Sequence, residues 1–276
     1  MTKDHSINKD DMITLAEQFI NDSPNNYISE EIALHPNCVS MKIYESPIFA
    51  FGSPHDELYT TYKSPDVIGS HFLSPPEWLP DAKTVISFFL PYTEQIKAAN
   101  AIDRYQPANQ WLHGRYEGQI LLSQLLEHLI ATLSEAGFQS LAPSLDPRCN
   151  MGNPEENFRF ASNWSERHVA YACGLGTFGL SRGIITKKGM SGRLGSILTT
   201  LDLPKDNRDY DETYAYCNMC GICIVNCPAQ AISYESGMEH ILCSNLLDKT
   251  RAKHAPRYGC GKCQVSVPCE SKIPMK

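Results

Sequence analysis

Eight cysteines in the last 60 residues of the chain have spacings that suit metal chemistry. Four of them belong to the run C-x2-C-x2-C-x3-C-P, which begins at Cys217 and ends at Pro228. The other four are Cys243, Cys260, Cys263 and Cys269. Three thiolates in such a run hold one [4Fe–4S] cluster, and its fourth cysteine ligates a different cluster. The spacing therefore predicts two [4Fe–4S] clusters in this part of the chain.

The ligands divide into two sets of four, with each loop supplying one cysteine to the other cluster. The first set is Cys217, Cys220, Cys223 and Cys269. The second set is Cys227, Cys243, Cys260 and Cys263. Cys269 departs from the usual pattern, because it follows Pro268 and five residues separate it from Cys263. Structural zinc is the alternative, although it favours separated C-x2-C pairs; a disulfide framework would require a secreted chain.

Composition limits the other functions. The chain has 276 residues and a formal net charge of −7, which disfavours nucleic acid as a main partner because phosphates require clustered Lys and Arg. No apolar run reaches 18 residues, so we expect no transmembrane helix and no membrane partner. The polar start at residues 1–5 and the lack of an Arg-Arg pair indicate no secretion signal. We therefore expect a cytoplasmic protein.

The part before the cysteines predicts an α/β (α+β) domain that must position them. Expected helices cover 9–21, 115–136 and 165–173, with Ser165 as a cap. Expected strands cover 38–51 (broken at Pro47), 84–90, 138–142, 183–186 and 194–203. Proline-rich 52–82 predicts an ordered loop, and 145–163 an irregular segment. We place the domain boundary near 208, giving an α/β domain at 1–207 and a two-cluster module at 208–276.

A glycine-rich turn follows the third expected helix. Gly174, Gly176 and Gly179 match the spacing G-x-G-x-x-G of dinucleotide-binding loops. That motif requires a strand before it, whereas a helix precedes it here, so nicotinamide binding is disfavoured.

Several short motifs, in order, resemble one family. They are Gly114-Arg115 before the leucine-rich helix, Glu166-Arg167 with Gly174-Leu175-Gly176 eight residues on, Leu194-Gly195, Leu203-Pro204, Cys243-Ser244, and Arg257-Tyr258-Gly259-Cys260. Over about residues 80–270 the chain resembles the epoxyqueuosine reductases, which are relatives of the corrinoid reductive dehalogenases.

The resemblance implies a nitroreductase-like core that binds cobalamin or another corrinoid, with its lower base detached from cobalt, followed by a ferredoxin-like module. The clusters would pass low-potential electrons, from a donor of ferredoxin or flavodoxin type, to a corrinoid that reduces a small-molecule substrate. The residues implied to line the corrinoid are Gly174, Leu175, Gly176, Gly179, Leu194 and Gly195. The chain has no D-x-H-x-x-G motif, which agrees with a detached base.

The chain also departs from the family. The catalytic aspartate of epoxyqueuosine reductases corresponds to Phe160, which cannot donate a proton. The longer C-terminal region that helps hold tRNA in that family and the twin-arginine signal of respiratory dehalogenases are both missing from this sequence. We therefore expect a cytoplasmic relative with a substrate other than tRNA.

Three residues on the helix before the glycines are candidate proton donors or positioning groups: Tyr171, His168 and Arg167. For each, a packed or hydrogen-bonded structural role is the alternative. A second function also stays open: an electron-transfer protein that reduces a corrinoid protein or another redox partner without a substrate of its own. The basic residues Arg251, Lys253, His254 and Arg257 either dock an acidic electron donor or offset the charge of the clusters.

Overall fold

A computed structural model describes residues 7–153 and 158–275 of the chain. Its centre is a four-stranded sheet with the order β1-β2-β8-β3, in which all neighbours are antiparallel. These strands are β1 (Ile48–Gly52), β2 (Thr84–Pro91), β3 (Ser140–Leu141) and β8 (Gly192–Thr199). The expected mixed α/β class is confirmed, in its α+β form. The polar residues 1–5 lie outside the described part.

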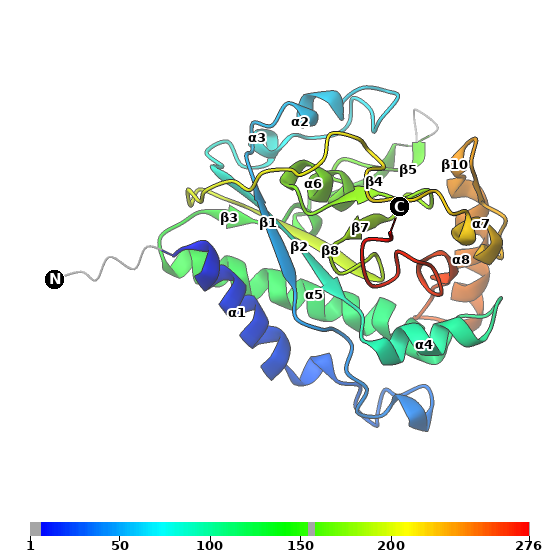
Figure 1. Ribbon diagram of the computed structural model, residues 1–276. Helices are drawn as coiled ribbons and strands as arrows, with labels where there is room; N and C mark the ends of the chain where they lie inside the picture. Colours follow the sequence, from blue (N-terminus) through cyan, green and yellow to red (C-terminus); the bar gives the residue numbers. More distant parts are fainter. Residues whose placement is uncertain (1–6, 154–157, 276) are drawn as a thin grey trace.

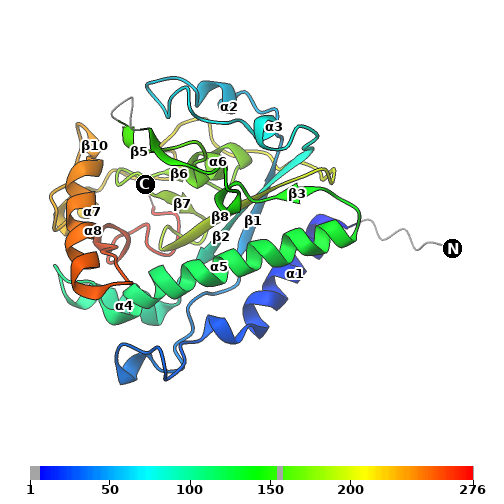
Figure 2. The same cartoon turned by 180° about the vertical axis from the view of Figure 1, so that it is seen from behind.

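Helices cover both faces of this sheet (Figures 1 and 2). Every residue of β2 is buried, because its two faces serve two separate cores. Ile86 and Leu90 pack with α1 (Lys9–Asp22) and α5 (Asn109–Glu135). Val85 and Phe89 pack on the opposite face with α6 (Glu166–Cys173). The alternation of a strand thus explains a continuous apolar run in the sequence.

The expected long helices are confirmed, with small changes in their bounds. In α1, Asn8 accepts hydrogen bonds from the backbone of Asp10 and Asp11, and the Asp11 side chain completes a capping box. Helix α5 begins six residues earlier than the expected 115, since 109–114 are also helical. It ends before Gly137, whose φ of +88° is the left-handed conformation that glycine adopts readily.

Several expectations for the N-terminal half need correction. The expected strand at 38–51 is strand only from Ile48, just after Pro47, while Lys42 and Tyr44 form isolated bridges. The segment 52–82 has no long helix, as expected, but contains the single turns α2 (Leu58–Thr61) and α3 (Pro75–Trp78). The helix α4 (Glu94–Ile102), which packs against α5, was not expected.

The segment expected to be irregular at 145–163 forms a hairpin of β4 (Met151–Asn153) and β5 (Phe158–Ser162). Phe160 lies in β5, and its side chain is outside the described part. The expected cap at Ser165 is wrong in detail, because its hydroxyl pairs with Nδ1 of His168 at 2.8 Å and not with the backbone. After α6, the glycine-rich turn continues into a hairpin of β6 (Gly176–Phe178) and β7 (Ile184–Thr186).

The cysteine-rich part lies at one end of the sheet (Figure 1). Its elements are α7 (Ile222–Asn226), β9 (Ile232–Ser233), β10 (Gly237–Met238) and α8 (His240–His254). The chain also has 3-10 turns at Pro24–Asn26, Pro36–Cys38, Pro143–Leu145 and Lys262–Gln264. Hydrogen bonds join this part to the core, for example from Lys97 Nζ to Ser271 Oγ at 2.6 Å. The boundary near 208 stays a prediction.

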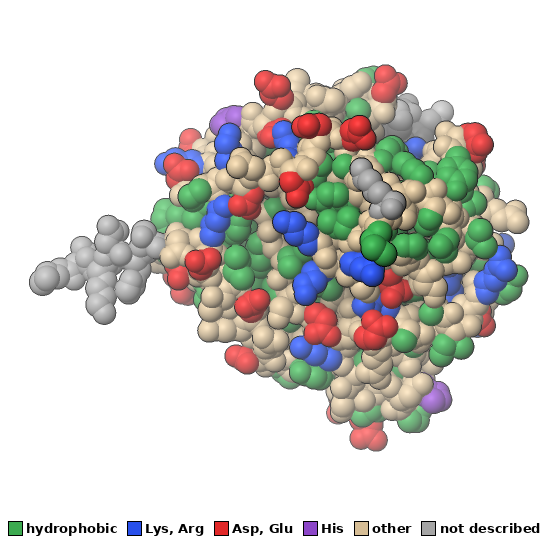
Figure 3. Space-filling view, viewed as in Figure 1, with side chains coloured by type: hydrophobic (Ala, Val, Ile, Leu, Met, Phe, Trp, Pro, Cys, Tyr) green, Lys and Arg blue, Asp and Glu red, His purple; other side chains and the backbone are tan. Residues whose placement is uncertain are grey.

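Charged side chains of both signs are interspersed over the face seen in Figure 3. Within residues 7–153 and 158–275, no helix is both long and apolar enough to cross a bilayer.

Candidate metal centre

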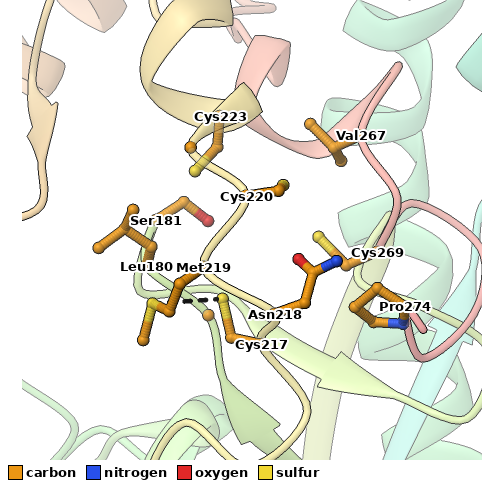
Figure 4. Close-up of a pocket in the computed structure, with 12 residues that line it drawn as sticks. Leu180, Ser181, Cys217, Asn218, Met219, Cys220, Cys223, Val267, Cys269 and Pro274 are labelled. Atoms are coloured by element: carbon orange, nitrogen blue, oxygen red, sulfur yellow. Dashed lines mark hydrogen bonds between the residues drawn. The ribbon is translucent and has the colours of Figure 1, made fainter. Parts of the chain in front are cut away.

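Four cysteine side chains line one pocket at the surface of the cysteine-rich part (Figure 4). They are Cys217, Cys220, Cys223 and Cys269. The pocket encloses about 340 Å³ of space not filled by protein atoms, part of which is open to solvent. The structure therefore brings together the four residues of the first predicted ligand set, although Cys269 lies 46 residues after Cys223 in the sequence.

Cys217 and Cys220 lie in a tightly coiled loop before α7, and Cys223 lies in the first turn of α7. Met219 and Gly221 both have positive φ, of 53° and 73°. A Cβ atom at Gly221 would lie 2.2 Å from the Tyr234 hydroxyl, so glycine is required there for space as well as for conformation. The backbone of this loop thus turns three thiols toward one side.

Cys269 reaches the pocket because the chain around it packs on the β7–β8 turn. Met190 N donates to the Cys269 carbonyl at 3.0 Å, and Ser191 N donates to the Glu270 carbonyl at 3.2 Å. A Cβ atom at Gly189 would lie 2.2 Å from the Glu270 carbonyl oxygen. This close contact explains how a cysteine with unusual spacing comes to face the others.

The second set gathers around the far end of α7. Cys227 follows α7 directly and Cys243 lies in α8. Cys263 lies within the 3-10 turn Lys262–Gln264, and Cys260 lies two residues before that turn. Their thiols are close enough to affect one another: beyond burial, Cys260, Cys243 and Cys227 all raise the pKa of Cys263. Helix α7 spans only 222–226, so it joins the two groups over a single turn.

Burial and repulsion between thiolates also raise the pKa values of cysteines in the first group. Burial first, and then Cys217 and Cys220, raise the pKa of Cys223 to about 11. The pKa of Cys269 rises to about 12 for the same reasons. Thiols that repel one another as thiolates are groups that a shared cationic centre would stabilise. Within the described residues, no three or more His, Cys, Asp or Glu side chains are arranged to hold a single metal ion.

Other residues beside the cysteines were not anticipated. The Met190 thioether lies 3.3 Å from Cys269 Sγ, and the Met219 thioether lies 3.8 Å from Cys217 Sγ. Lys262, between the cysteines of the C-x2-C pair, is buried and donates to the Asn100 carbonyl at 2.7 Å. Lys262 could have been predicted to lie near the cysteines, because it stands between two of them in the sequence. Met190 and Asn100 are remote in sequence, so no sequence pattern indicated their position near the cysteines.

The three candidate catalytic residues on α6 have partners within the protein. Tyr171 is buried, and its hydroxyl donates to the Asp211 carbonyl at 3.4 Å. Burial, then Arg167 and Arg182, lower the pKa of His168 to about 4. Arg167 is exposed and donates to the Arg182 carbonyl at 2.8 Å. None of the three lines the cysteine pocket, and their catalytic role stays a prediction.

Packing within the protein accounts for the glycines expected to line a corrinoid. Gly174 ends α6 with a φ of +91°. Cβ atoms at Gly176 and Gly195 would lie 2.2 Å from the Ile185 carbonyl oxygen and 2.6 Å from the Phe88 ring. Gly179 lines the pocket with the first cysteine group. Two neighbours take part in packing: Leu175 is buried, and Leu194 is partly buried against the same core. A role of these residues in corrinoid binding stays a prediction.

Three residues of the expected basic cluster, Arg251, Lys253 and Arg257, each bond a different side chain. Arg251 pairs with Asp248 at 3.0 Å, and Arg257 pairs with Glu117 at 2.5 Å. Lys253 Nζ donates to Gln106 Oε1 at 3.1 Å, so these cations do not form one unpaired patch.

The fold of the chain resembles that of several solved structures. Epoxyqueuosine reductase from Bacillus subtilis shares 19% sequence identity at a TM-score of 0.51, over 84% of this chain and 63% of that one. The enzyme from Streptococcus thermophilus shares 18% identity at a TM-score of 0.50, over 83% and 64% of the two chains. A reductive dehalogenase described with a mechanism for B12-dependent dehalogenation shares 14% identity at a TM-score of 0.53, over 83% of this chain and 30% of that chain. No family model matches the chain, and no curated protein matches its sequence.

These similarities define the class of fold. The chain has the fold of the epoxyqueuosine reductases and corrinoid reductive dehalogenases, and the expected resemblance is confirmed at that level. It spans 63% and 64% of the length of the two epoxyqueuosine reductases and 30% of that of the dehalogenase.

Proposed function

We propose that this chain is an iron–sulfur reductase. In this proposal, two [4Fe–4S] clusters pass low-potential electrons to a base-off corrinoid that reduces a small-molecule substrate. The observation that carries it is the meeting of Cys217, Cys220, Cys223 and Cys269 around one pocket, on a fold shared with B12-dependent dehalogenases.

The donor set fits a multi-iron cluster in its chemistry and its arrangement. Four of the groups that line the pocket are thiols, the ligands that iron–sulfur clusters require; Ser181 and Asn218 also line it. Figure 4 shows them spread around a hollow. Within the described residues, by contrast, no group of three or more His, Cys, Asp or Glu side chains is arranged to hold a single ion such as zinc.

The chain itself would hold both clusters and set the path between them. Cys227 Sγ accepts a hydrogen bond from Ala231 N at 3.3 Å, which stabilises the charge of a thiolate. Because α7 separates the two cysteine groups by one turn, electrons that enter at the exposed pocket have a short route inward. A bound corrinoid would supply a strongly reducing cobalt centre; that part of the proposal rests on the fold.

The substrate we propose is a small molecule. One epoxyqueuosine reductase with this fold has been solved with a tRNA stem loop. By the resemblance described above, Phe160 corresponds to the catalytic aspartate of that family, and the net charge of the chain is −7. Both features disfavour the same epoxide chemistry on tRNA.

The test is a count of iron and cobalt per chain after anaerobic purification. Visible and EPR spectra are recorded before and after addition of cob(II)alamin. We expect about eight irons, since two cubes carry four each, and a base-off cobalt signal. Cys269→Ser should leave about four irons, whereas the control Cys149→Ser, a half-buried cysteine outside both groups, should keep eight.

Other outcomes contradict the proposal in defined ways. Finding zinc in place of iron would refute the prediction of two [4Fe–4S] clusters. An unchanged iron content in Cys269→Ser would refute the proposed ligand sets. Eight irons with no change in the cobalt spectrum would leave the two-cluster electron carrier as the function.

A further inference from the structure

Two neighbouring arginines near the second cysteine group lack a carboxylate partner. Arg115 lies in α5 and Arg193 in β8, and Arg193 Nη2 donates to the Arg115 carbonyl at 3.4 Å and to Gln119 Oε1 at 2.5 Å. The Nε atom of each arginine is buried and has no hydrogen-bond partner within the described part of the chain. A buried N–H donor that lacks an acceptor is costly.

The adjacent arginines differ in this respect. Arg251 and Arg257 have their own carboxylates, Asp248 and Glu117, at 3.0 and 2.5 Å. Among the described residues, no Asp or Glu forms an ion pair with Arg115 or Arg193. Arg115 and Arg193 thus differ from Arg251 and Arg257 in having no carboxylate of their own.

Tyr258 marks the place where this charge is concentrated. Its ring lies between the guanidinium groups of Arg115 and Arg251, at 4.4 and 4.3 Å. The site lies beside the second cysteine group, because Tyr258 precedes Cys260 by two residues.

We infer that Arg115 and Arg193, with Tyr258 beside them, bind an anionic oxygen group of a small molecule, either a phosphate or a carboxylate. Guanidinium groups present planar forks of N–H donors that match such groups bidentately. The anion can belong to the substrate or to the phosphodiester in the nucleotide loop of a corrinoid. The choice between these sources rests on the proposed function, whereas the anion site itself does not.

The test uses the full chain with its iron, kept anaerobic, and pyrophosphate as the probe. The melting temperature is followed against pyrophosphate concentration, with sodium chloride holding the ionic strength constant. We expect saturable stabilisation of the wild type. Arg115→Gln and Arg193→Gln should weaken the apparent affinity by about tenfold or more, because each removes a charge-assisted hydrogen-bonding fork.

Two further variants keep the result interpretable. Arg104→Gln removes an exposed arginine whose Nη2 bonds the Val225 carbonyl, and it should bind pyrophosphate as the wild type does. Arg193→Lys keeps the charge and should fall between the wild type and Arg193→Gln. Absence of saturable stabilisation, or equal affinity in all variants, would overturn the inference. Loss of iron with unchanged affinity would also overturn it and assign the arginines to cluster charge alone.

Cobalamin and cobinamide, which lacks the nucleotide phosphate, identify the source of the anion. If the corrinoid supplies it, Arg193→Gln weakens cobalamin binding about tenfold and leaves cobinamide binding unchanged. If the substrate supplies it, both corrinoids bind the variant as they bind the wild type. If neither corrinoid binds, the proposed function fails, while the pyrophosphate result still decides the anion site.

Discussion

A buried ion pair between α5 and the segment before Cys260 should contribute strongly to stability. Glu117 Oε1 accepts from Arg257 Nη2 at 2.5 Å, and Oε2 accepts from Arg257 Nε at 3.2 Å. Oε2 also lies 3.0 Å from Nδ1 of the fully buried His113. Nε2 of that ring accepts from Leu34 N at 3.0 Å, so Nδ1 carries the proton and donates to Glu117.

We predict that Glu117→Gln lowers the free energy of unfolding by about 3 kcal/mol. Removing one partner of a buried ion pair typically costs about 3–5 kcal/mol. We take the lower end because 14% of the Arg257 side chain remains exposed and water can solvate part of its charge. The glutamine has the same shape, so the change measures the lost charge and not a cavity.

Urea unfolding at pH 7 measures this difference as a shift in midpoint at an unchanged slope. The matched control is Glu127→Gln, which removes an exposed carboxylate from the same helix and should change stability by less than about 0.5 kcal/mol. Equal effects of the two substitutions would refute the reasoning.

The effect should also depend on pH with a definite sign. Burial alone would raise the pKa of Glu117, but hydrogen bonds from His113 and Arg257 bring it below its ordinary value of 4.5. The stabilisation is therefore fully present above pH 4.5 and is lost as the pH falls below it. The difference between wild type and Glu117→Gln should shrink over that range.

Two further predictions concern other buried positions. Burial raises the pKa of Glu166 to about 7, with Ser196 and Trp164 offsetting part of the rise, so wild type should lose stability relative to Glu166→Gln as the pH increases from 4.5 through 7. Urea midpoints at pH 5 and 8 check this, and equal differences at both values would contradict it. Gly176→Ala should cost about 3 kcal/mol, because its Cβ would lie 2.2 Å from a carbonyl oxygen. Gly137→Ala should cost only about 1 kcal/mol, since only its positive φ is unfavourable; similar midpoints for the two variants would disprove this account.

Sequence reasoning succeeded where one local pattern determined an element. The leucines of α5 repeat at helical spacing, and the apolar run of β2 is short and ends at a proline. It failed where the signal was weak or depended on remote partners. The β4–β5 hairpin has no strong alternation, and α4 is short and is stabilised by packing on α5.

The assignment of the cysteines to two ligand sets likewise depended on contacts between remote parts of the chain. Their spacing suggested two sets of four, but Cys269 was doubtful because no local rule fixes a cysteine after a proline. The contact of Glu270 with Gly189, some 80 residues earlier, places Cys269 at the pocket. Arg115 and Arg193 likewise become neighbours only because α5 packs beside the end of β8.

The sequence by itself thus predicted the kind of chemistry, because thiols at fixed short spacings within one loop are a local pattern. Tertiary structure decided which groups face one another, which arginines lack an anion, and which glycines are needed for packing. Those properties depend on contacts between segments far apart in the chain, and no short-range periodicity encodes them.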